Sequence, residues 1–155
     1  MKFGGGITRF FLITTLRHHS FNSLLVDRCK KLGGRWDGEE RAWVFSGLVE
    51  SEVEEMDEVY NSNLIAVELK ALDDISERHS SVKFLGYSIA KATGRDSGAT
   101  LSEGVSLISG RVTSGGSMKN WTTFISEGTV IRLMVPELLL ENSIDDLRDW
   151  DVKRI

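Results

Sequence analysis

Glycine placement limits the folds open to this chain more than any other feature of its sequence. Seven of the fifteen glycines fall in residues 1–49 and eight in residues 82–136, so residues 48–85 contain none. Because glycine adopts left-handed backbone conformations without strain, it concentrates where a chain turns. The pattern predicts two turn-rich modules, at 1–75 and 82–136, with a polar linker within 73–81 and an acidic tail at 137–155.

The first module is predicted to alternate strands and helices. Ser20 or Asn22 can cap the first helix, and Gly33 and Gly34 can end it by allowing a left-handed turn. After that helix, Asp37–Gly38 is typical of a tight hairpin turn. The predicted elements are a strand at 9–16, a helix that runs through Leu24, Leu25, Cys29 and Leu32, hairpin strands at 35–36 and 42–45, a helix at 47–61 and a strand at 64–72.

The second module has no helical pattern until its end. Its predicted strands lie at 82–92, 104–113, 120–126 and 128–135, separated by Gly/Ser-rich turns. Pro136 ends the last strand because it cannot donate to a ladder, and a helical turn is predicted at 137–142. The tail with Trp150 is either a docked helix or disordered. The predicted fold class is therefore α+β, with an antiparallel β module in the second part.

Charge divides the chain at similar places. The formal net charge of −4 separates into +4 for residues 1–49, −8 for 50–81, +3 for 82–136 and −3 for 137–155. The negative net charge of the whole chain excludes a protein that coats nucleic acid non-specifically. Two locally basic segments remain, and both also carry tryptophan.

The most informative stretch is residues 30–45, KKLGGRWDGEERAWVF. It resembles a short module of the form K-x-L-G-(G/A)-R-W-D followed by (K/R)-x-W-x-(F/V), related to the HARP repeat of annealing helicases. The resemblance covers residues 8–62 at most. Such modules occur in phage and mobile-element proteins beside primase, topoisomerase and helicase domains, so the resemblance implies a role near DNA processing without an enzymatic activity.

The hairpin residues allow two interpretations. Cross-strand pairing would bring Trp36 and Trp43 together, and both could simply belong to the core. Alternatively, Arg35 and Arg41 contact phosphates while a tryptophan stacks on a base. The basic hairpin is therefore the first candidate site for nucleic acid or a nucleotide.

The glycine-rich turns of the second module form the other candidate site. Lys119, Asn120 and Trp121 offer a cation, an amide and a stacking face, and Arg95 adds charge to a turn at 94–98. The simpler interpretation is that these residues form ordinary hairpin turns, which require glycine and serine.

The sequence contains no recognisable catalytic or metal-binding constellation. His18 and His19 are adjacent, His79 lies in the predicted linker, and Cys29 is the only cysteine, so we expect no metal and no cofactor. Ser97 lies in GRDSG, which lacks nucleophile-elbow spacing. The chain is therefore predicted not to be an enzyme.

The predicted helix at 47–61 places Leu48 on its apolar side and a dense row of carboxylates on the other. That row is either a solvated face or a mimic of phosphates that occupies a basic site on another protein. The candidate protein-contact residues are Glu50, Glu54, Glu55 and Glu58.

We therefore predict a non-enzymatic binding protein of a phage or mobile element, with single-stranded nucleic acid or a nucleotide as its ligand. The alternative is a counter-defence inhibitor that contacts a host defence protein, or that sequesters a nucleotide second messenger. The sequence predicts no membrane-spanning segment or signal peptide, so the expected location is the cytoplasm, that of the host if a phage encodes the chain. Homo-oligomerisation is left open.

Overall fold

The computed structural model describes residues 9–12, 21–143 and 147–155. The chain divides into two compact units, Met1–Ser62 and Asn63–Ile155. With 22% helix, 45% strand and several small antiparallel sheets, it has the expected α+β class. The strand predicted at 64–72 belongs to the second unit, so the division falls earlier in the chain than the expected module end at residue 75.

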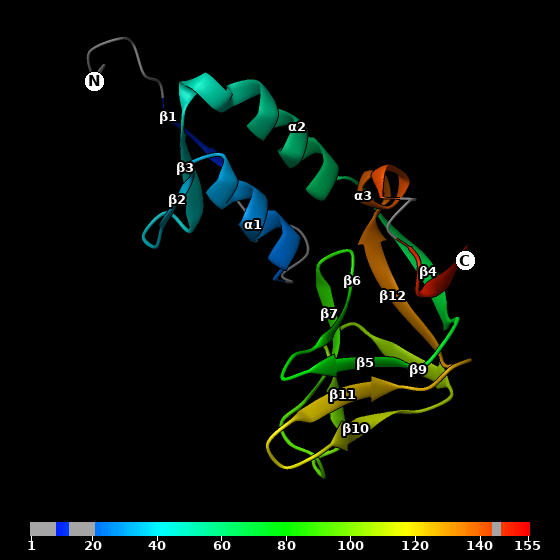
Figure 1. Cartoon of the computed structure of the whole chain (residues 1–155). Helices are drawn as coiled ribbons and strands as arrows, with labels where there is room; N and C mark the ends of the chain where they lie inside the picture. The colour runs from blue at the N-terminus through cyan, green and yellow to red at the C-terminus, as the bar shows by residue number, and fades with distance from the viewer. Residues whose placement is uncertain (1–8, 13–20, 144–146) are drawn as a thin grey trace. The chain divides into compact units, whose positions relative to one another are not determined.

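The first unit combines a small sheet with two helices (Figure 1). Among the described residues of this unit, three antiparallel strands follow the order β1-β3-β2. The elements are β1 (Arg9–Leu12), α1 (Ser23–Lys31), β2 (Arg35–Asp37), β3 (Ala42–Ser46), the 3₁₀ helix η1 (Gly47–Val49) and α2 (Glu50–Tyr60).

Local sequence signals define both ends of α1. The Asn22 side chain caps its start by accepting from the backbone N–H groups of Leu24 and Leu25, at 3.0 and 3.1 Å. At its end, the Gly33 amide donates to the Lys30 carbonyl and the Gly34 amide to the Cys29 carbonyl. With Gly33 at φ +78°, this is a Schellman motif, and the predicted stop is confirmed. The alternative cap, Ser20, lies outside the described residues.

The core of the first unit lies between the helices and the sheet. Leu48 is the exception to the predicted apolar side, because it falls in η1, before the regular helix begins, and is 84% exposed. The buried side chains are Leu25 and Cys29 of α1, Trp43 and Phe45 of β3, and Val53, Met56, Val59 and Tyr60 of α2.

The described residues of the second unit form three antiparallel sheets. Their strand orders are β13-β4-β12-β9, β10-β11-β5 and β6-β7-β8, and α3 (Glu137–Asn142) follows β12. The strands are β4 (Leu64–Ala71), β5 (Ile75–Arg78), β6 (Val82–Phe84), β7 (Tyr87–Ala92), β8 (Ala99–Leu101), β9 (Ser106–Ser109), β10 (Val112–Gly116), β11 (Trp121–Ile125), β12 (Val130–Pro136) and β13 (Trp150–Arg154).

Two segments for which no strand was predicted contain strands: the expected linker, and the tail expected to be a docked helix or disordered. The predicted linker contains β5, because Ile75 is buried and pairs with Ile125 of β11. The predicted tail contains β13, which pairs with β4 and buries Trp150 against Phe84, with ring centroids 6.5 Å apart. Polar composition concealed both strands because each has a single large apolar residue directed into the core.

The strand predicted at 82–92 is two strands joined by a tight turn. Leu85 and Gly86 both have positive φ, at +51° and +87°, as a type I′ hairpin turn requires. The prediction missed this turn because Leu85 is an unusual residue for the left-handed region. It also missed β8, which pairs with β7.

Candidate functional site

The β2–β3 hairpin is the part of the first unit with the most distinctive exposed chemistry. Its register places Trp36 opposite Trp43 and Arg35 opposite Val44. The connection is four residues long, from Gly38 to Arg41, so the hairpin is present where predicted but its turn is longer than the tight turn expected at Asp37–Gly38. The left-handed residue is Arg41, at φ +52°, and Gly38 is not among the residues with positive φ.

Asp37 explains why the longer turn forms. Its Oδ1 accepts hydrogen bonds from the backbone N–H groups of Glu39 and Glu40, at 3.0 and 3.2 Å. An aspartate at the start of a turn often satisfies amides in this way. The turn is therefore organised by the aspartate side chain rather than by the conformational freedom of Gly38.

The two tryptophans have different environments. Their ring centroids lie 5.8 Å apart with an interplanar angle of 65°, an edge-to-face arrangement. Trp43 is 7% exposed and belongs to the core, whereas Trp36 is 47% exposed. Trp43 therefore suits the interpretation as a core residue, and Trp36 suits the interpretation as a stacking residue. Of the two, only Trp36 has a ring available for stacking on a ligand.

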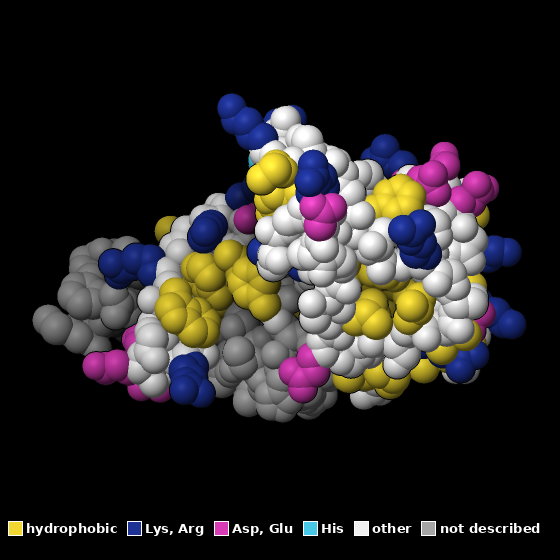
Figure 2. All heavy atoms as spheres, turned by 90° about the horizontal axis from the view of Figure 1, so that it is seen from below, with side chains coloured by type: hydrophobic (Ala, Val, Ile, Leu, Met, Phe, Trp, Pro, Cys, Tyr) yellow, Lys and Arg dark blue, Asp and Glu magenta, His cyan; other side chains and the backbone are white. Residues whose placement is uncertain are grey.

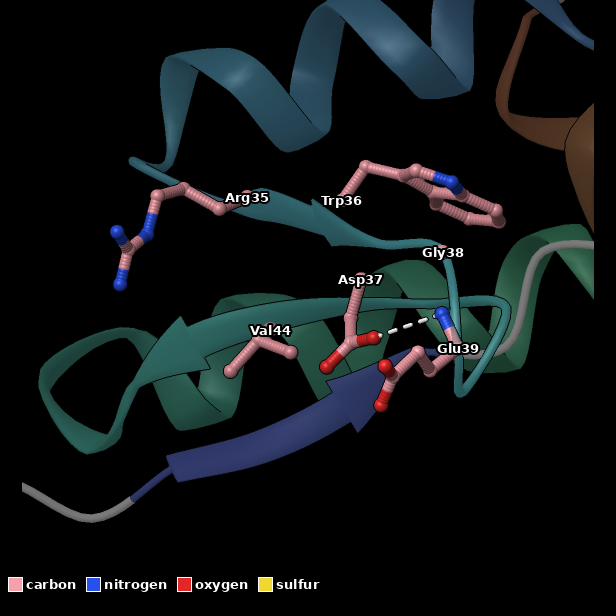
Figure 3. Close-up of a pocket in the computed structure, with 6 residues that line it drawn as sticks. All are labelled: Arg35, Trp36, Asp37, Gly38, Glu39 and Val44. Atoms are coloured by element: carbon pink, nitrogen blue, oxygen red, sulfur yellow. Dashed lines mark hydrogen bonds between the residues drawn. The ribbon is translucent and has the colours of Figure 1, made fainter.

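Trp36 borders an open pocket of about 550 Å³ (Figure 3). Arg35 extends from one end of the pocket, whereas Asp37 and Glu39 present carboxylates toward the turn. The Trp36 ring itself lies on the other side of the β2 ribbon from the Asp37, Glu39 and Val44 side chains, because successive strand residues face opposite sides of a sheet (Figure 3). The pocket lining consists of Arg35, Trp36, Asp37, Gly38, Glu39 and Val44.

Arg35 and Arg41 are both exposed, and neither forms an ion pair with another described residue. Lys30 and Lys31, at the end of α1 shortly before β2, are exposed as well. Cations at a helix C-terminus interact favourably with its dipole. Four exposed cations therefore lie within 30–41, next to the exposed indole in the sequence.

In the second unit, Lys119, Asn120 and Trp121 belong to a closed network of contacts. The Arg78 guanidinium donates to Oδ1 of Asn120, and the Lys119 carbonyl lies 2.8 Å from Nε2 of His79. The His79 and Trp121 rings are 5.3 Å apart. The Asn120 side-chain oxygen and the Lys119 carbonyl are therefore already engaged in contacts within the second unit.

Arg78 and His79 are the members of this cluster that sequence reasoning missed. Both were assigned to the linker, and β5 brings them beside β11. The exposed cations Arg78 and Lys119 give this surface a positive charge. A linker prediction contains no signal that could have revealed the pairing, because β5 meets β11 more than forty residues later in the chain.

Arg95 lies in a separate turn that is tied to β10. Ser114 Oγ donates to the Arg95 carbonyl and accepts from the Gly98 amide, both at 2.8 Å. The Arg95 side chain pairs with Asp96 at 3.0 Å, which neutralises part of its charge. Ser97 Oγ is occupied within the same turn, where it donates to the Gly94 and Gly98 carbonyls.

Cys29 is fully buried, and burial raises the pKa of its thiol to about 12. Burial also raises the pKa of the nearby Tyr60 hydroxyl, and the Arg28 guanidinium, 5.9 Å from the Tyr60 ring, opposes that shift. At neutral pH, Cys29 is therefore a protonated core residue rather than a nucleophile.

The acidic residues of α2 form an exposed row. No ion pair joins any of them to another described residue, although Asp57 accepts from Nδ2 of Asn61 at 2.6 Å. The row comprises Glu50, Glu52, Glu54, Glu55, Asp57 and Glu58.

Hydrophobic side chains are also exposed, and on the face drawn in Figure 2 several lie next to Lys or Arg side chains.

Within the described ranges, no group of three or more His, Cys, Asp or Glu side chains is arranged to hold a metal ion. His18 and His19 lie outside these ranges. Of the helices in the described part of the chain, none is both long and apolar enough to cross a membrane.

Comparison of the chain with protein-family models, curated proteins and solved structures gave no significant match. The resemblance of residues 8–62 to the HARP-like module therefore stays a prediction, and the functional argument depends on the geometry described above.

Proposed function

We propose that this protein is a non-enzymatic binding protein for single-stranded nucleic acid and that the β2–β3 hairpin is its principal contact. The observation that carries the proposal is the half-exposed Trp36 ring, held edge-on against the buried Trp43, in a hairpin that also carries the exposed cations Arg35 and Arg41. The predicted phage or mobile-element origin is part of this proposal.

Single strands fit this site better than a duplex. An exposed indole face can stack on an unpaired base, and such stacking contributes about 1–3 kcal/mol per base. In a duplex the same base face is already covered by its neighbours. Because Trp36 is fixed by Trp43, little side-chain entropy is lost when a base stacks on it.

Charge limits the mode of binding. The carboxylates of α2 repel a polyanion, so among the described residues of the first unit phosphates are expected to approach near Arg35, Arg41 and the end of α1. The exposed cations Arg78 and Lys119 of the second unit offer further phosphate contacts. A short binding site with a modest salt dependence follows from this distribution.

The test is fluorescence anisotropy with a labelled oligonucleotide at low and moderate salt. Trp36→Ala should weaken binding by about 5- to 150-fold, the equivalent of about 1–3 kcal/mol. Leu48→Ala, which removes another exposed apolar side chain from the same unit, should leave binding unchanged. Equal affinities for the wild type and Trp36→Ala would refute the assigned site.

The arginines have a separate signature. Arg35→Ala and Arg41→Ala should each lower the slope of log K against log salt by about 0.7, the value for one phosphate contact on a single strand. Failure of the wild type to bind at low salt would reject the proposed function altogether.

A second candidate function is that of a counter-defence inhibitor that acts by protein–protein contact. The observation that favours it is the exposed acidic row on α2, which could occupy a basic nucleic-acid site on a host protein. Reversing Glu50, Glu54, Glu55 and Glu58 to lysine should then abolish capture of that host protein from lysate. An unchanged set of captured proteins would contradict this function.

Sequestration of a nucleotide second messenger is a variant of that candidate. The glycine-rich turns and Arg78 and Lys119 are the groups that could hold its phosphates. A bound nucleotide should raise the melting temperature of the protein by mass action. If saturating cyclic nucleotides leave the melting temperature unchanged, this variant is excluded.

A further inference from the structure

Strand β13 forms an unpaired edge of its sheet. In the strand order β13-β4-β12-β9, the only described strand that pairs with β13 is β4 (Figure 1, where β13 is red). The amide of Ile155, which directly follows β13, donates to the Ala66 carbonyl of β4 at 3.1 Å. Backbone groups of an antiparallel strand point alternately to its two sides, so those of Val152 and Arg154 point away from β4. Such an edge is a template for a further strand.

The solvent-facing side of this sheet carries charges of alternating sign. Lys153 lies opposite Glu68 of β4, and the Glu68 carboxylate accepts from Nε of Arg132 on β12 at 2.9 Å. In the next row, Asp151 lies opposite Lys70 of β4. Asp151 and Lys153 are both exposed, and neither forms an ion pair with another described residue. The edge strand therefore presents one available charge of each sign.

We infer that β13 pairs antiparallel with β13 of a second copy of this chain, about a two-fold axis at Val152. In this register Val152 faces its own counterpart, so the outward backbone groups of the two strands meet. Asp151 of each copy then lies opposite Lys153 of the other. Opposite charges in directly opposed positions stabilise a strand pair, whereas like charges destabilise it. The alternation of sign thus continues from one sheet into the other.

The same charges select the register. A shift by two residues places Asp151 opposite Asp151 in one direction and Lys153 opposite Lys153 in the other. A shift by one residue sets outward backbone groups against inward ones. Charged side chains ordinarily protect an exposed edge from pairing, but here they oppose both neighbouring registers and favour one. Because a two-fold contact closes on two copies, the expected product is a dimer, and this inference does not depend on the proposed function.

The experiment is sedimentation equilibrium of the whole chain without nucleic acid. Over a concentration series, the mass should rise from 17.3 kDa towards twice that value. Val152→Pro should keep the monomer mass, because proline removes the outward N–H that the second copy meets. A proline is tolerated on an edge strand where that N–H faces away from the neighbouring strand, so the variant should retain the fold.

Charge reversal tests the register. Asp151→Lys and Lys153→Asp each place like charges in opposed positions, so each variant alone should dimerise about 2- to 30-fold more weakly, the range for two lost cross-strand pairs. In an equal mixture of the two variants, the lysines of one lie opposite the aspartates of the other, so association should return. Lys91→Asp is the control, because it makes the same charge change at an exposed position of β7 and should leave the dimer unchanged.

Each contrary outcome is distinct. A wild-type chain that keeps the monomer mass at every concentration refutes self-pairing. A dimer that persists in Val152→Pro and in both charge variants overturns the assignment to β13. A mixture that associates no better than either charge variant alone rejects the register centred on Val152. Weakening by Lys91→Asp to the same extent would attribute the effect to net charge and would likewise overturn the assignment.

Discussion

Replacing Gly34 with alanine tests how the candidate hairpin is seated on the first unit. A Cβ atom at Gly34 would lie 2.5 Å from Cε1 of Phe45, 2.9 Å from its Cζ and 2.8 Å from the Cys29 carbonyl oxygen. Phe45 is buried, and the Cys29 carbonyl already accepts from the Gly34 amide at 2.9 Å, so neither can move freely.

The expected cost follows from packing alone. Gly34 does not have a positive φ, so alanine fits its backbone conformation and the whole penalty comes from the close approach. Overpacking of this kind typically costs about 1–3 kcal/mol. In a unit of this size, each kilocalorie corresponds to about 4–8 °C in melting temperature. Gly34→Ala should therefore lower the melting temperature of the first unit measurably.

The assay is urea denaturation followed by circular dichroism at helical wavelengths, since α1 and α2 belong to the first unit. Phe45→Leu removes the ring atoms nearest the new methyl group, so the cost of Gly34→Ala should shrink in that background. Gly33→Ala is the control: nothing lies within 4 Å of its Cβ, and its φ of +78° should cost about 1 kcal/mol whichever residue is at position 45.

A loss below about 0.5 kcal/mol for Gly34→Ala would refute the close approach, because that is the range of neutral surface substitutions. Equal costs in the wild-type and Phe45→Leu backgrounds would show that the ring is not what the methyl group meets. Either result would contradict the described seating of the hairpin on α1.

Three further predictions concern other parts of the fold. Arg41→Gly should stabilise the first unit by about 1 kcal/mol in urea denaturation, because glycine relieves the left-handed strain at φ +52°; an unchanged midpoint would contradict this. Between pH 9 and about 12 the folded chain keeps the Cys29 proton, whereas the unfolded chain loses it. The free energy of unfolding should therefore fall as the pH rises through this window, and in Cys29→Val it should fall less steeply. Trp150→Ala should cost about 3–5 kcal/mol in thermal unfolding, whereas its exposed neighbour Asp151→Ala should be nearly neutral; similar losses would argue against a buried β13.

The helices show how far local sequence carries a prediction. The α1 boundaries follow from an asparagine that can cap and a glycine that can turn, and both signals act within four residues. The turn at 38–41 marks the limit of such reasoning. The Asp-Gly pair favoured a tight turn, but the hydrogen bonds of the Asp37 side chain and the strand register produced a longer one.

The sequence by itself therefore determined the α+β class, the C-terminal end of α1 and the residue types available at each candidate site, and it left two candidates for the cap at the start of α1. Only the tertiary structure decided that β5 and β13 are strands, because their pairing partners lie far away in the chain. It also decided that Trp43 is core and Trp36 is exposed, although the two face each other across one hairpin. Burial depends on what packs over a side chain, and that packing is a property of the assembled fold rather than of neighbouring residues.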